Sequence, residues 1–254
     1  MLVQLPFKPR LFEYESTDST NERAFAAIAD GSASHGDVHI AEHQTAGRGR
    51  LGRQWQADEG EGLLFSVVLF PPVNGPKPTE LTVATCLALY DMACEFEVPG
   101  IRLKWPNDLL SGDSKLCGIL LETRGLDEAK PHFVVGVGLN VLQREFPREV
   151  TEERSVTSLA LQGVRASRKI VFDIIWKKLD NRLRQDAAEL FADYTTALAL
   201  DGEVVLRTSK SEVRGQLVAV ESRAGVRIRM GDGQVVETPL EFVRSLSQSA
   251  RGSC

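Results

Sequence analysis

The stretch from Ala46 to Trp55, AGRGRLGRQW, brings three glycines and three arginines together without an acidic residue. Glycine lets the backbone adopt positive φ and approach a ligand closely, and arginine offers paired donors that match a phosphate or a carboxylate. Because these like charges repel one another, we expect the loop to become ordered when an anionic ligand neutralises them. The composition of the loop predicts a site for a polyphosphate or an acyl phosphate. A solvated surface turn is the competing interpretation.

The context of this loop argues against two common nucleotide-binding folds. Gly47, Gly49 and Gly52 match the G-x-G-x-x-G spacing of dinucleotide-binding folds, but that motif requires a helix directly after it, and residues 54–62 (QWQADEGEG) have the composition of a loop. A P-loop requires Lys and then Ser or Thr after its last glycine, where this chain has Arg53 and Gln54.

Composition places the chain among ordinary globular proteins. It has 254 residues, of which 43% are hydrophobic and 26% charged, and a net charge of -5. The acidic balance argues against general binding to nucleic acids or membrane surfaces. There is no apolar run of membrane-spanning length, no signal peptide and no C-x-x-C pair. We therefore expect a cytoplasmic protein with reduced thiols, with Cys86 and Cys94 in the core.

Apolar patterning predicts buried strands over 63–70 and 132–141 and a long helix over 79–96. Gly136 and Gly138 lie on the same side of the second strand, so a ligand or another backbone must approach that face. Beyond it we expect a short helix starting at Thr157 and a long helical region over 167–199. Four short strands follow, at 204–207, 213–220, 226–230 and 235–239, and predict a small closed barrel.

Four motifs together resemble one enzyme family. GRGRLGRQW at 47–55, KWPND at 104–108, KLCGILLE at 115–122 and GVGLN at 136–140 occur in the order and spacing of the biotin protein ligases, and DSTN at 18–21 resembles their first biotin-contacting turn. The resemblance covers about residues 12–246 and implies an α+β fold. Residues 1–200 would form a catalytic domain with a class II synthetase-like mixed sheet and helices, and residues 201–254 an SH3-like barrel.

The resemblance also implies the reaction. The biotin carboxylate would attack the α-phosphorus of ATP, with Mg²⁺ accompanying the nucleotide, and give biotinyl-5′-AMP and pyrophosphate. A lysine of a biotin carboxyl carrier protein would then attack the mixed anhydride, and AMP would leave. The first step brings a carboxylate against a polyphosphate, so the site needs preorganised positive charge.

Family positions assign the site residues. The catalytic cations would be Lys115, Arg50, Arg48 and Lys104. Biotin would be bound by Ser19, Thr20, Asn21, Gln44, Gly47, Arg48, Gly49, Arg50, Lys115, Gly118, Leu120, Gly136 and Gly138. ATP would be bound by Arg50, Arg53, Trp55, Lys104, Asn107, Lys115 and Asn140. Asp108 is the candidate ligand for Mg²⁺.

The chain departs from the family pattern in two places. It has no room for the N-terminal winged-helix domain of some members, so we expect neither DNA binding nor repressor function. Its second loop, residues 142–157, has no tryptophan to pack on adenine, and Phe146 is the substitute in this sequence. Homodimers joined at a sheet edge are common in the family, although no residue pattern here establishes one.

Two other functions compete with the ligase. Lipoate ligases and octanoyl transferases share this type of fold but carry a different glycine-rich signature. A biotin or nucleotide sensor derived from a ligase would be expected to have lost Arg50 or Lys115, and both are present.

Overall fold

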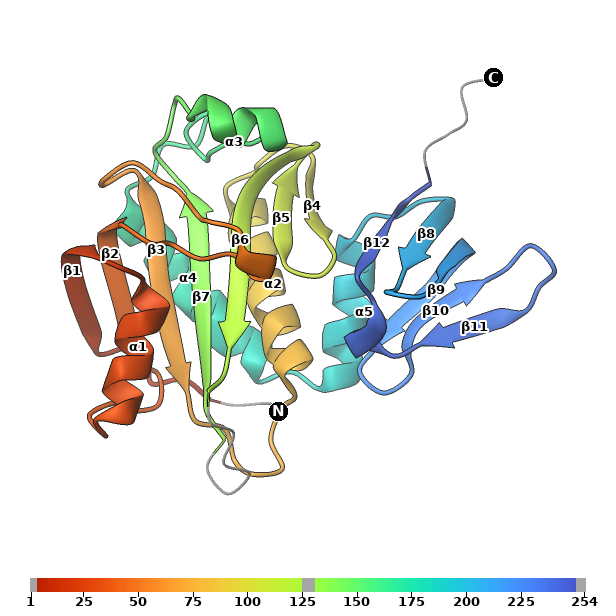
Figure 1. Cartoon of the computed structure of the whole chain (residues 1–254), viewed down its shortest axis with the longest axis horizontal. Helices are drawn as coiled ribbons and strands as arrows, with labels where there is room; N and C mark the ends of the chain where they lie inside the picture. Colours follow the sequence, from red (N-terminus) through yellow and green to blue (C-terminus); the bar gives the residue numbers. More distant parts are fainter. Residues whose placement is uncertain (1–3, 125–130, 250–254) are drawn as a thin grey trace.

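The computed structural model describes residues 4–124 and 131–249, and within these ranges the strands form two sheets (Figure 1). The larger sheet contains β1 (Leu11–Thr17), β2 (Val38–Gln44), β3 (Gly62–Leu69), β4 (Ile101–Lys104), β5 (Asp108–Ser111), β6 (Ser114–Glu122) and β7 (Phe133–Asn140). The smaller contains β8 (Glu203–Arg207), β9 (Glu212–Glu221), β10 (Gly225–Arg229), β11 (Val235–Thr238) and β12 (Ser245–Gln248). The helices are α1 (Thr20–Ala29), α2 (Pro78–Glu95), α3 (Arg148–Glu153), α4 (Arg168–Leu183) and α5 (Ala187–Ala197), with short 3₁₀ turns η1 (Arg50–Gly52) and η2 (Leu240–Phe242).

The larger sheet is mixed, as the resemblance implies. Its strand order is β1-β2-β3-β7-β6-β5-β4, in which β1 and β2 run parallel and the other neighbouring pairs run antiparallel. Side chains alternate across each strand, so Leu63, Phe65 and Val67 of β3 enter the large core while Val68 faces the other side. The two faces of this sheet therefore have different neighbours.

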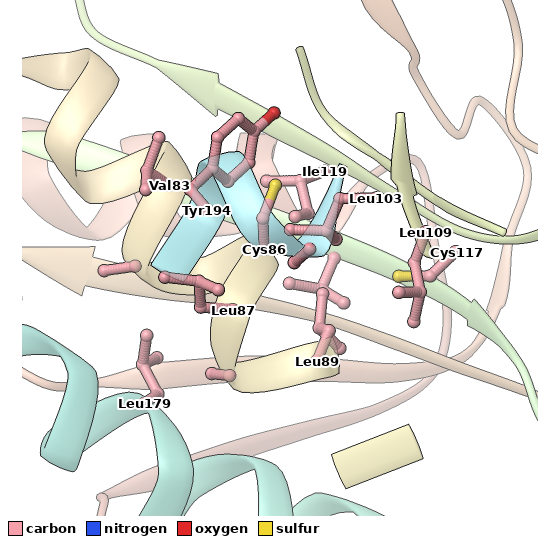
Figure 2. Close-up of a cluster of buried hydrophobic side chains, with 14 of the residues drawn as sticks. Val83, Cys86, Leu87, Leu89, Leu103, Leu109, Cys117, Ile119, Leu179 and Tyr194 are labelled. Carbon is pink, nitrogen blue, oxygen red and sulfur yellow. The ribbon is translucent and has the colours of Figure 1, made fainter. Parts of the chain in front are cut away.

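One face packs against α2 and α4 and holds most of the hydrophobic core. Figure 2 shows this packing, with Cys86 and Leu89 of α2 next to Leu103 of β4 and Ile119 of β6, all buried. Helix α2 begins at Pro78, whose fixed φ suits the first helical position, and Glu80 Oε2 accepts a hydrogen bond from the Lys77 backbone N–H at 3.0 Å. Because α2 is buried along most of its length, it fixes the sheet from behind.

The other face is covered only in part. Ala24 and Phe25 of α1 pack against Val68 of β3 and Val134 of β7 and form a small second core. Helix α1 lies in front of the sheet in Figure 1, and the loop after β2 crosses in front of β7 and β6. The first cavity described below lies between the first turn of α1 and this loop, and the second lies between this loop and α3 (Arg148–Glu153).

The smaller sheet is antiparallel, with the order β11-β10-β9-β8-β12, and it agrees with the expected SH3-like C-terminal part. It is attached to the larger part by specific contacts. Trp105 Nε1 donates a hydrogen bond to the Val243 backbone carbonyl at 3.2 Å, and the Val220 backbone N–H of β9 donates to Thr195 Oγ1 of α5 at 3.0 Å. The boundary at residue 200 stays a prediction. No helix among the described residues is both long and apolar enough to cross a membrane.

Several local predictions were wrong. The helical region 167–199 divides into α4 and α5 because Asp186 caps a new helix by accepting from Ala188 N–H at 2.8 Å. The short helix lies at 148–153, before Thr157 rather than after it, and strand β12 was missed. Cys94 is exposed while Cys86 is buried, because eight residues rotate a helix about 80° beyond two turns.

The packing behind the sheet predicts a large stability difference between two leucine positions. Leu89 is fully buried in α2, whereas Leu161 is 46% exposed. Leu89→Ala should lower the free energy of unfolding by about 2–5 kcal/mol, because it removes buried methyl groups and leaves a cavity. Leu161→Ala, the matched control, should change it by less than about 0.5 kcal/mol. Urea titration followed by circular dichroism measures both, and equal effects would contradict this account of the core.

Candidate active site

The site begins at the N-terminus of α1, where hydroxyl and amide side chains replace the apolar cover of the sheet. Ser19, Thr20 and Asn21 are each less than 5% exposed. Ser66, in the otherwise apolar strand β3, points toward them: its Oγ lies 2.6 Å from Thr20 Oγ1 and 2.5 Å from Asn21 Oδ1. A buried hydroxyl in mid-strand is thus satisfied by the first turn of α1.

Gln44, the last residue of β2, completes this polar end. Its Oε1 accepts from the Thr20 backbone N–H at 2.7 Å and from Thr20 Oγ1 at 3.1 Å. With Oε1 used in this way, the Gln44 amide nitrogen remains as a donor for a ligand. Ser19 makes no capping hydrogen bond with its side chain. This end of the site therefore offers the donors and acceptors that a small polar group needs.

The glycines of β6 and β7 form a wall without side chains. A Cβ on Gly136 would lie 2.4 Å from Asn21 Oδ1, and a Cβ on Gly138 would lie 2.4 Å from the Trp55 ring. Gly118 is opposite Gly138 in the register and also contacts the Trp55 ring and the Lys115 side chain. The prediction was that a ligand or another backbone approaches this face, whereas in this structure the side chains of Asn21 and Trp55 lie against the glycines.

The glycine-rich loop folds as a short hairpin over this wall. Gly49 N–H donates to the Arg53 carbonyl at 2.7 Å, and Trp55 N–H donates to the Gly47 carbonyl at 3.0 Å. At the tip, Leu51 has φ 58° and is 78% exposed. The base of the hairpin directs Arg48 back toward the sheet.

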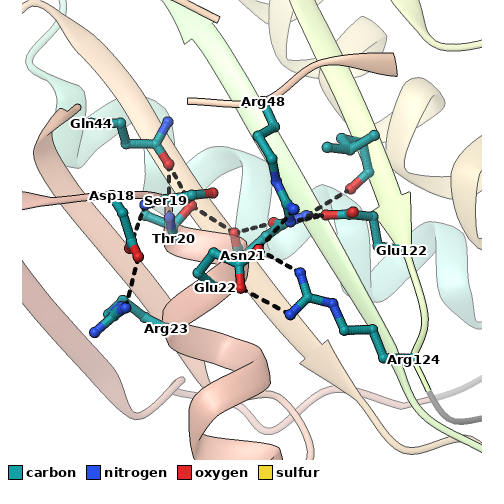
Figure 3. A network of polar contacts seen from close by, with 12 residues as sticks. Asp18, Ser19, Thr20, Asn21, Glu22, Arg23, Gln44, Arg48, Glu122 and Arg124 are labelled. Carbon is teal, nitrogen blue, oxygen red and sulfur yellow. Dashed lines mark hydrogen bonds and ion pairs between the residues drawn. The ribbon is translucent and has the colours of Figure 1, made fainter. Parts of the chain in front are cut away.

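Arg48 makes two ion pairs. Its Nη1 lies 2.7 Å from Glu22 Oε1, and its Nη2 lies 2.7 Å from Glu122 Oε2. Glu122 Oε2 also accepts from Asn21 Nδ2 at 2.7 Å, and Glu22 pairs with Arg124 (Figure 3). The predicted biotin-binding residues Asn21 and Arg48 thus meet at one carboxylate that sequence reasoning did not assign to the site.

Lys115 is held from both sides. Its backbone N–H donates to the Ser155 carbonyl, and its carbonyl accepts from Thr157 N–H, each at 2.9 Å. Its Nζ lies 2.6 Å from Asp108 Oδ1 and 5.5 Å from the centre of the Trp55 ring. Because the side chain is only 12% exposed, this cation is fixed in position and partly neutralised.

Arg50 is held by a neutral partner. Its Nη1 donates to Asn107 Oδ1 at 3.2 Å, and Asn107 Nδ2 donates to the Ile119 carbonyl at 2.6 Å. Among the described residues, neither Arg50 nor Arg53 has an acidic partner within ion-pair distance. These two arginines keep their full charge for a ligand.

Two cavities lie next to each other around Trp55. The first has a volume of about 90 Å³. Most of the predicted site lines it: Ser19, Thr20, Asn21, Gln44, Arg48, Gly49, Arg50, Arg53, Trp55, Asn107, Asp108, Lys115, Gly118, Leu120, Gly136 and Gly138. The second has about 390 Å³ and lies between the loop and α3. Ligand sites typically measure about 300–1,000 Å³, so the first cavity is narrow and the second has the size of a ligand site.

Three predicted residues lie outside the first cavity. Lys104 is exposed and lines neither cavity. Gly47 lies at the base of the hairpin, where its Cβ would meet the Trp55 carbonyl at 2.4 Å. Asn140 lines the second cavity, but its amide donates to the Thr157 carbonyl at 2.9 Å and accepts from Gln143 Nε2 at 3.4 Å. Its interactions hold the backbone that clamps Lys115.

Arg154 is a site residue that sequence reasoning missed. It lines both cavities, and its side chain is 28% exposed and pairs with Glu153 at 3.2 Å. It lies in a polar segment that the sequence marks as a loop, and only the pairing of residues 155–157 with Lys115 brings it to the site. Phe146 and Val150 give the second cavity an apolar wall beside this arginine.

The acidic residues of the site fit a magnesium ion that is bound together with a nucleotide. Over residues 4–124 and 131–249, no three His, Cys, Asp or Glu side chains are grouped so that they could hold a metal. Among the described residues that line the first cavity, Asp108 is the single carboxylate, and it pairs with Lys115. Mg²⁺ is commonly bound by one or two carboxylates together with substrate phosphates. The donors fit an ion that arrives with ATP rather than a resident metal.

The ion pairs of Glu22 predict a pH-dependent contribution to stability. The hydrogen bonds from Arg124 lower the pKa of Glu22 below its ordinary value of 4.5; partial desolvation opposes them and the charge of Arg48 supports them. Ionised Glu22 therefore stabilises the fold above pH 4.5, and this contribution disappears as the pH falls through the lowered pKa. The difference in unfolding free energy between wild type and Glu22→Gln should shrink on acidification, measured by urea titration at several pH values. If this difference in unfolding free energy does not change with pH, the ion pairs of Glu22 make no pH-dependent contribution to stability.

Known proteins match this chain over most of its length. The model of the biotin/lipoate A/B protein ligase family matches residues 13–140. The biotin--[acetyl-CoA-carboxylase] ligase of Mycobacterium tuberculosis is 41% identical over 188 residues, which cover 70% of this chain and 66% of the relative. The bifunctional ligase/repressor BirA of Bacillus subtilis is 26% identical over 227 residues, or 87% of this chain and 70% of that protein. The biotin protein ligase from Aquifex aeolicus, solved with biotin and ATP, matches with a TM-score of 0.77 at 31% identity and covers 94% of this chain and 99% of its own. The chain belongs to the biotin/lipoate A/B protein ligase family.

Proposed function

We propose that this chain is an ATP-dependent biotin–protein ligase, which forms biotinyl-5′-AMP and transfers biotin to a lysine of a biotin carboxyl carrier protein. The observation that carries the proposal is one cavity with two chemically different ends. Thr20, Asn21 and Gln44 give it a polar, neutral end, and Arg50 and Lys115 give it a cationic end. A ligand with a polar head and a carboxylate tail, such as biotin, matches this arrangement.

The neutral end binds the ureido group of biotin. Thr20 and Gln44 are joined to each other, which leaves the Gln44 amide nitrogen to donate to the ureido oxygen. The glycine wall of β6 and β7 accommodates the bicyclic ring and the valerate chain. Trp55 is in contact with this wall, so it moves aside or packs over the chain when biotin enters.

The cationic end carries the first half-reaction. The biotin carboxylate oxygen attacks the α-phosphorus of ATP, the bond to the bridging oxygen breaks, and pyrophosphate leaves. Arg50, Arg53 and Lys115 neutralise the two anionic reactants, and Lys115 is held in place by its backbone clamp. Fixed cations around the reacting phosphate stabilise the transition state because they need no reorganisation. Mg²⁺ would accompany ATP and supply further charge stabilisation, and Asp108 is the candidate residue to hold it.

The second cavity binds the nucleotide. It adjoins the first at Trp55 and Lys115, and Arg154 lines both. Arg154 therefore faces the phosphate chain from the side opposite the hairpin. Phe146 and Val150 offer an apolar surface for adenine, so Phe146 takes the packing role that the missing tryptophan would have. Asn140 supports this wall through its hydrogen bonds to the backbone.

The second half-reaction takes place at the open side of the first cavity. The ε-amine of the carrier lysine attacks the carbonyl of the mixed anhydride, loses a proton and displaces AMP. The smaller sheet is anchored at Trp105, two residues before Asn107, and contributes to docking of the carrier. The absence of DNA binding and a homodimer joined at a sheet edge stay predictions.

Lipoate and octanoate are less suitable substrates for this cavity. Their tails end in apolar or disulfide-bearing groups, which cannot pair with the amide of Gln44 or the hydroxyl of Ser19. Unpaired polar groups in a buried pocket cost about 1–3 kcal/mol each. The relatives named above are biotin ligases, in agreement with this argument.

Substitution of Lys115 tests the cationic end. Lys115→Ala should lower kcat for biotinyl-AMP formation by on the order of a hundredfold, since a fixed charge at the phosphate is lost. Lys115→Arg should rescue only in part, because its planar fork is larger than the ammonium. Lys210→Ala, at an exposed lysine in the turn between β8 and β9, is the matched control. Pyrophosphate release with labelled ATP measures all three variants. If the alanine variant turns over at the wild-type rate, Lys115 has no catalytic role.

Substitution of Gly136 tests the biotin end. The new Cβ in Gly136→Ala would lie 2.4 Å from Asn21 Oδ1, so Asn21 must move from the pocket wall. We expect the KM for biotin to rise about tenfold, which corresponds to one lost hydrogen bond. Gly231→Ala, where a Cβ meets nothing within 4 Å, serves as the control. Saturation kinetics with biotin measure the KM of both variants. Equal KM values would mean that this glycine is not required in the pocket.

A further inference from the structure

The two arginines at the centre of the hairpin have different surroundings. Arg48 contacts a carboxylate with each terminal nitrogen, Glu22 from α1 and Glu122 from β6, both at 2.7 Å. Arg50, two residues on, has only the neutral Asn107 as a hydrogen-bond partner among the described residues. One arginine is therefore neutralised before any ligand binds, and the other is not.

The carboxylates that hold Arg48 are themselves held. Glu22 accepts hydrogen bonds from both terminal nitrogens of Arg124, and the Arg124 guanidinium lies 4.2 Å from the centre of the Phe25 ring. The four charges of Glu22, Arg48, Glu122 and Arg124 sum to zero. A charge-balanced group of this kind provides little attraction for a substrate carboxylate or phosphate.

Glu122 contacts both the loop and the polar end of the cavity with a single atom. Its Oε2 accepts from Arg48 Nη2 and from Asn21 Nδ2, each at 2.7 Å. The second bond fixes the Asn21 amide, so that Asn21 Oδ1 faces Ser66 Oγ at 2.5 Å. Displacement of Asn21 would thus disturb the carboxylate that anchors the loop, and opening of the loop would disturb Asn21. Figure 3 shows the contacts of Glu122 with Arg48 and Asn21.

Building on the proposed ligase activity, we propose that Glu122 is a positioning residue that acts through Arg48. Glu22, Arg48 and Glu122 form a clasp, which keeps the hairpin of residues 46–55 closed over the cavity. The oxygen that Glu122 shares with Asn21 links closure of the hairpin to occupancy of the biotin end. Arg48 holds the hairpin to the sheet, and Arg50 and Arg53 bind the negatively charged groups of the ligand.

The clasp predicts which step a mutation changes. The intermediate biotinyl-AMP leaves only when the hairpin opens, so a weaker clasp should raise its rate of escape. Chemistry at the phosphate depends on Lys115, which is held by Asp108, and on Arg50, whose side chain is held by Asn107. Because neither contact involves the clasp, the rate of adenylation in the closed form should change little. A purely structural role for Glu122 would instead lower stability and both rates together.

Glu122→Gln tests this most cleanly, because glutamine keeps the shape and an acceptor for Asn21 but removes the charge. We expect escape of biotinyl-AMP from preloaded enzyme to become about tenfold faster, about 1.4 kcal/mol, with adenylation within about twofold of wild type. Glu95→Gln is the matched control, because Glu95 pairs with Lys178 at 2.8 Å on the far helices. Unchanged escape from the Glu122 variant overturns the link between the clasp and the ligand.

A double-mutant cycle separates the clasp from independent effects. Arg48→Gln should raise escape as much as Glu122→Gln, and the double variant should add little, because both changes break the same contact. If the two effects on escape multiply, the residues act independently and the proposal is wrong.

A second readout needs no enzyme activity. In the ligand-free protein, trypsin should cut after Arg50 and Arg53 about tenfold faster in Glu122→Gln than in wild type, with an unchanged thermal midpoint. Unchanged cleavage overturns the clasp itself. If the wild-type protein forms no biotinyl-AMP, the ligase proposal fails, and the cleavage experiment still decides whether the clasp holds the hairpin.

Discussion

The register of the three central strands is the constraint on which the site depends. It places Gly118 opposite Gly138, and Ser66 opposite Gly136. A shift of one residue would turn each strand over, so that Val135 and Val137 would fill the cavity and the glycines would face the core. Those valines pack in the large core on the far side of the sheet. The packing that stabilises the fold therefore also keeps the site face free of side chains.

Charge neutralisation inside the protein decides what each cation can do. Lys115 is partnered by Asp108, and Arg48 by two glutamates, whereas Arg50 and Arg53 have no acidic partner among the described residues. A buried or half-buried cation without a partner is costly, which explains why the deeper cations are paired and the unpaired ones lie on an exposed hairpin. A polyanionic ligand would thus meet the unpaired arginines first and would have to compete with Asp108 for Lys115.

Apolar patterns predicted the larger elements, because buried strands and a buried helix leave strong signals in the sequence. The residues that line the first cavity were assigned from the resemblance to the biotin protein ligases instead. The glycine pair in β7 also predicted that something would approach this face. Neither the sequence patterns nor the resemblance predicted Arg154 or Glu122 as part of the site. Arg154 reaches the cavities only because Lys115 pairs with residues 155–157, and Glu122 meets Arg48 across 74 residues of sequence. Long-range pairing of polar groups leaves no local pattern. Lys104 lies outside the cavities because the strand ends with that side chain facing solvent.

The hairpin of residues 46–55 is poorly stabilised by its own turn. Leu51 adopts φ 58° and is 78% exposed, and a non-glycine residue in this region costs about 1–2 kcal/mol. Its support comes from the hydrogen bonds at its base, from the ion pairs of Arg48, from the hydrogen bond of Arg50 to Asn107 and from the Trp55 ring against the glycine wall. The tip itself is strained and exposed, so these side-chain contacts keep the hairpin on the sheet. A ligand that binds the closed form better than an open form would stabilise the closed form further. The alternation of glycine and arginine in this loop thus combines two requirements: one arginine that holds the loop to the sheet, and others that remain charged for the ligand.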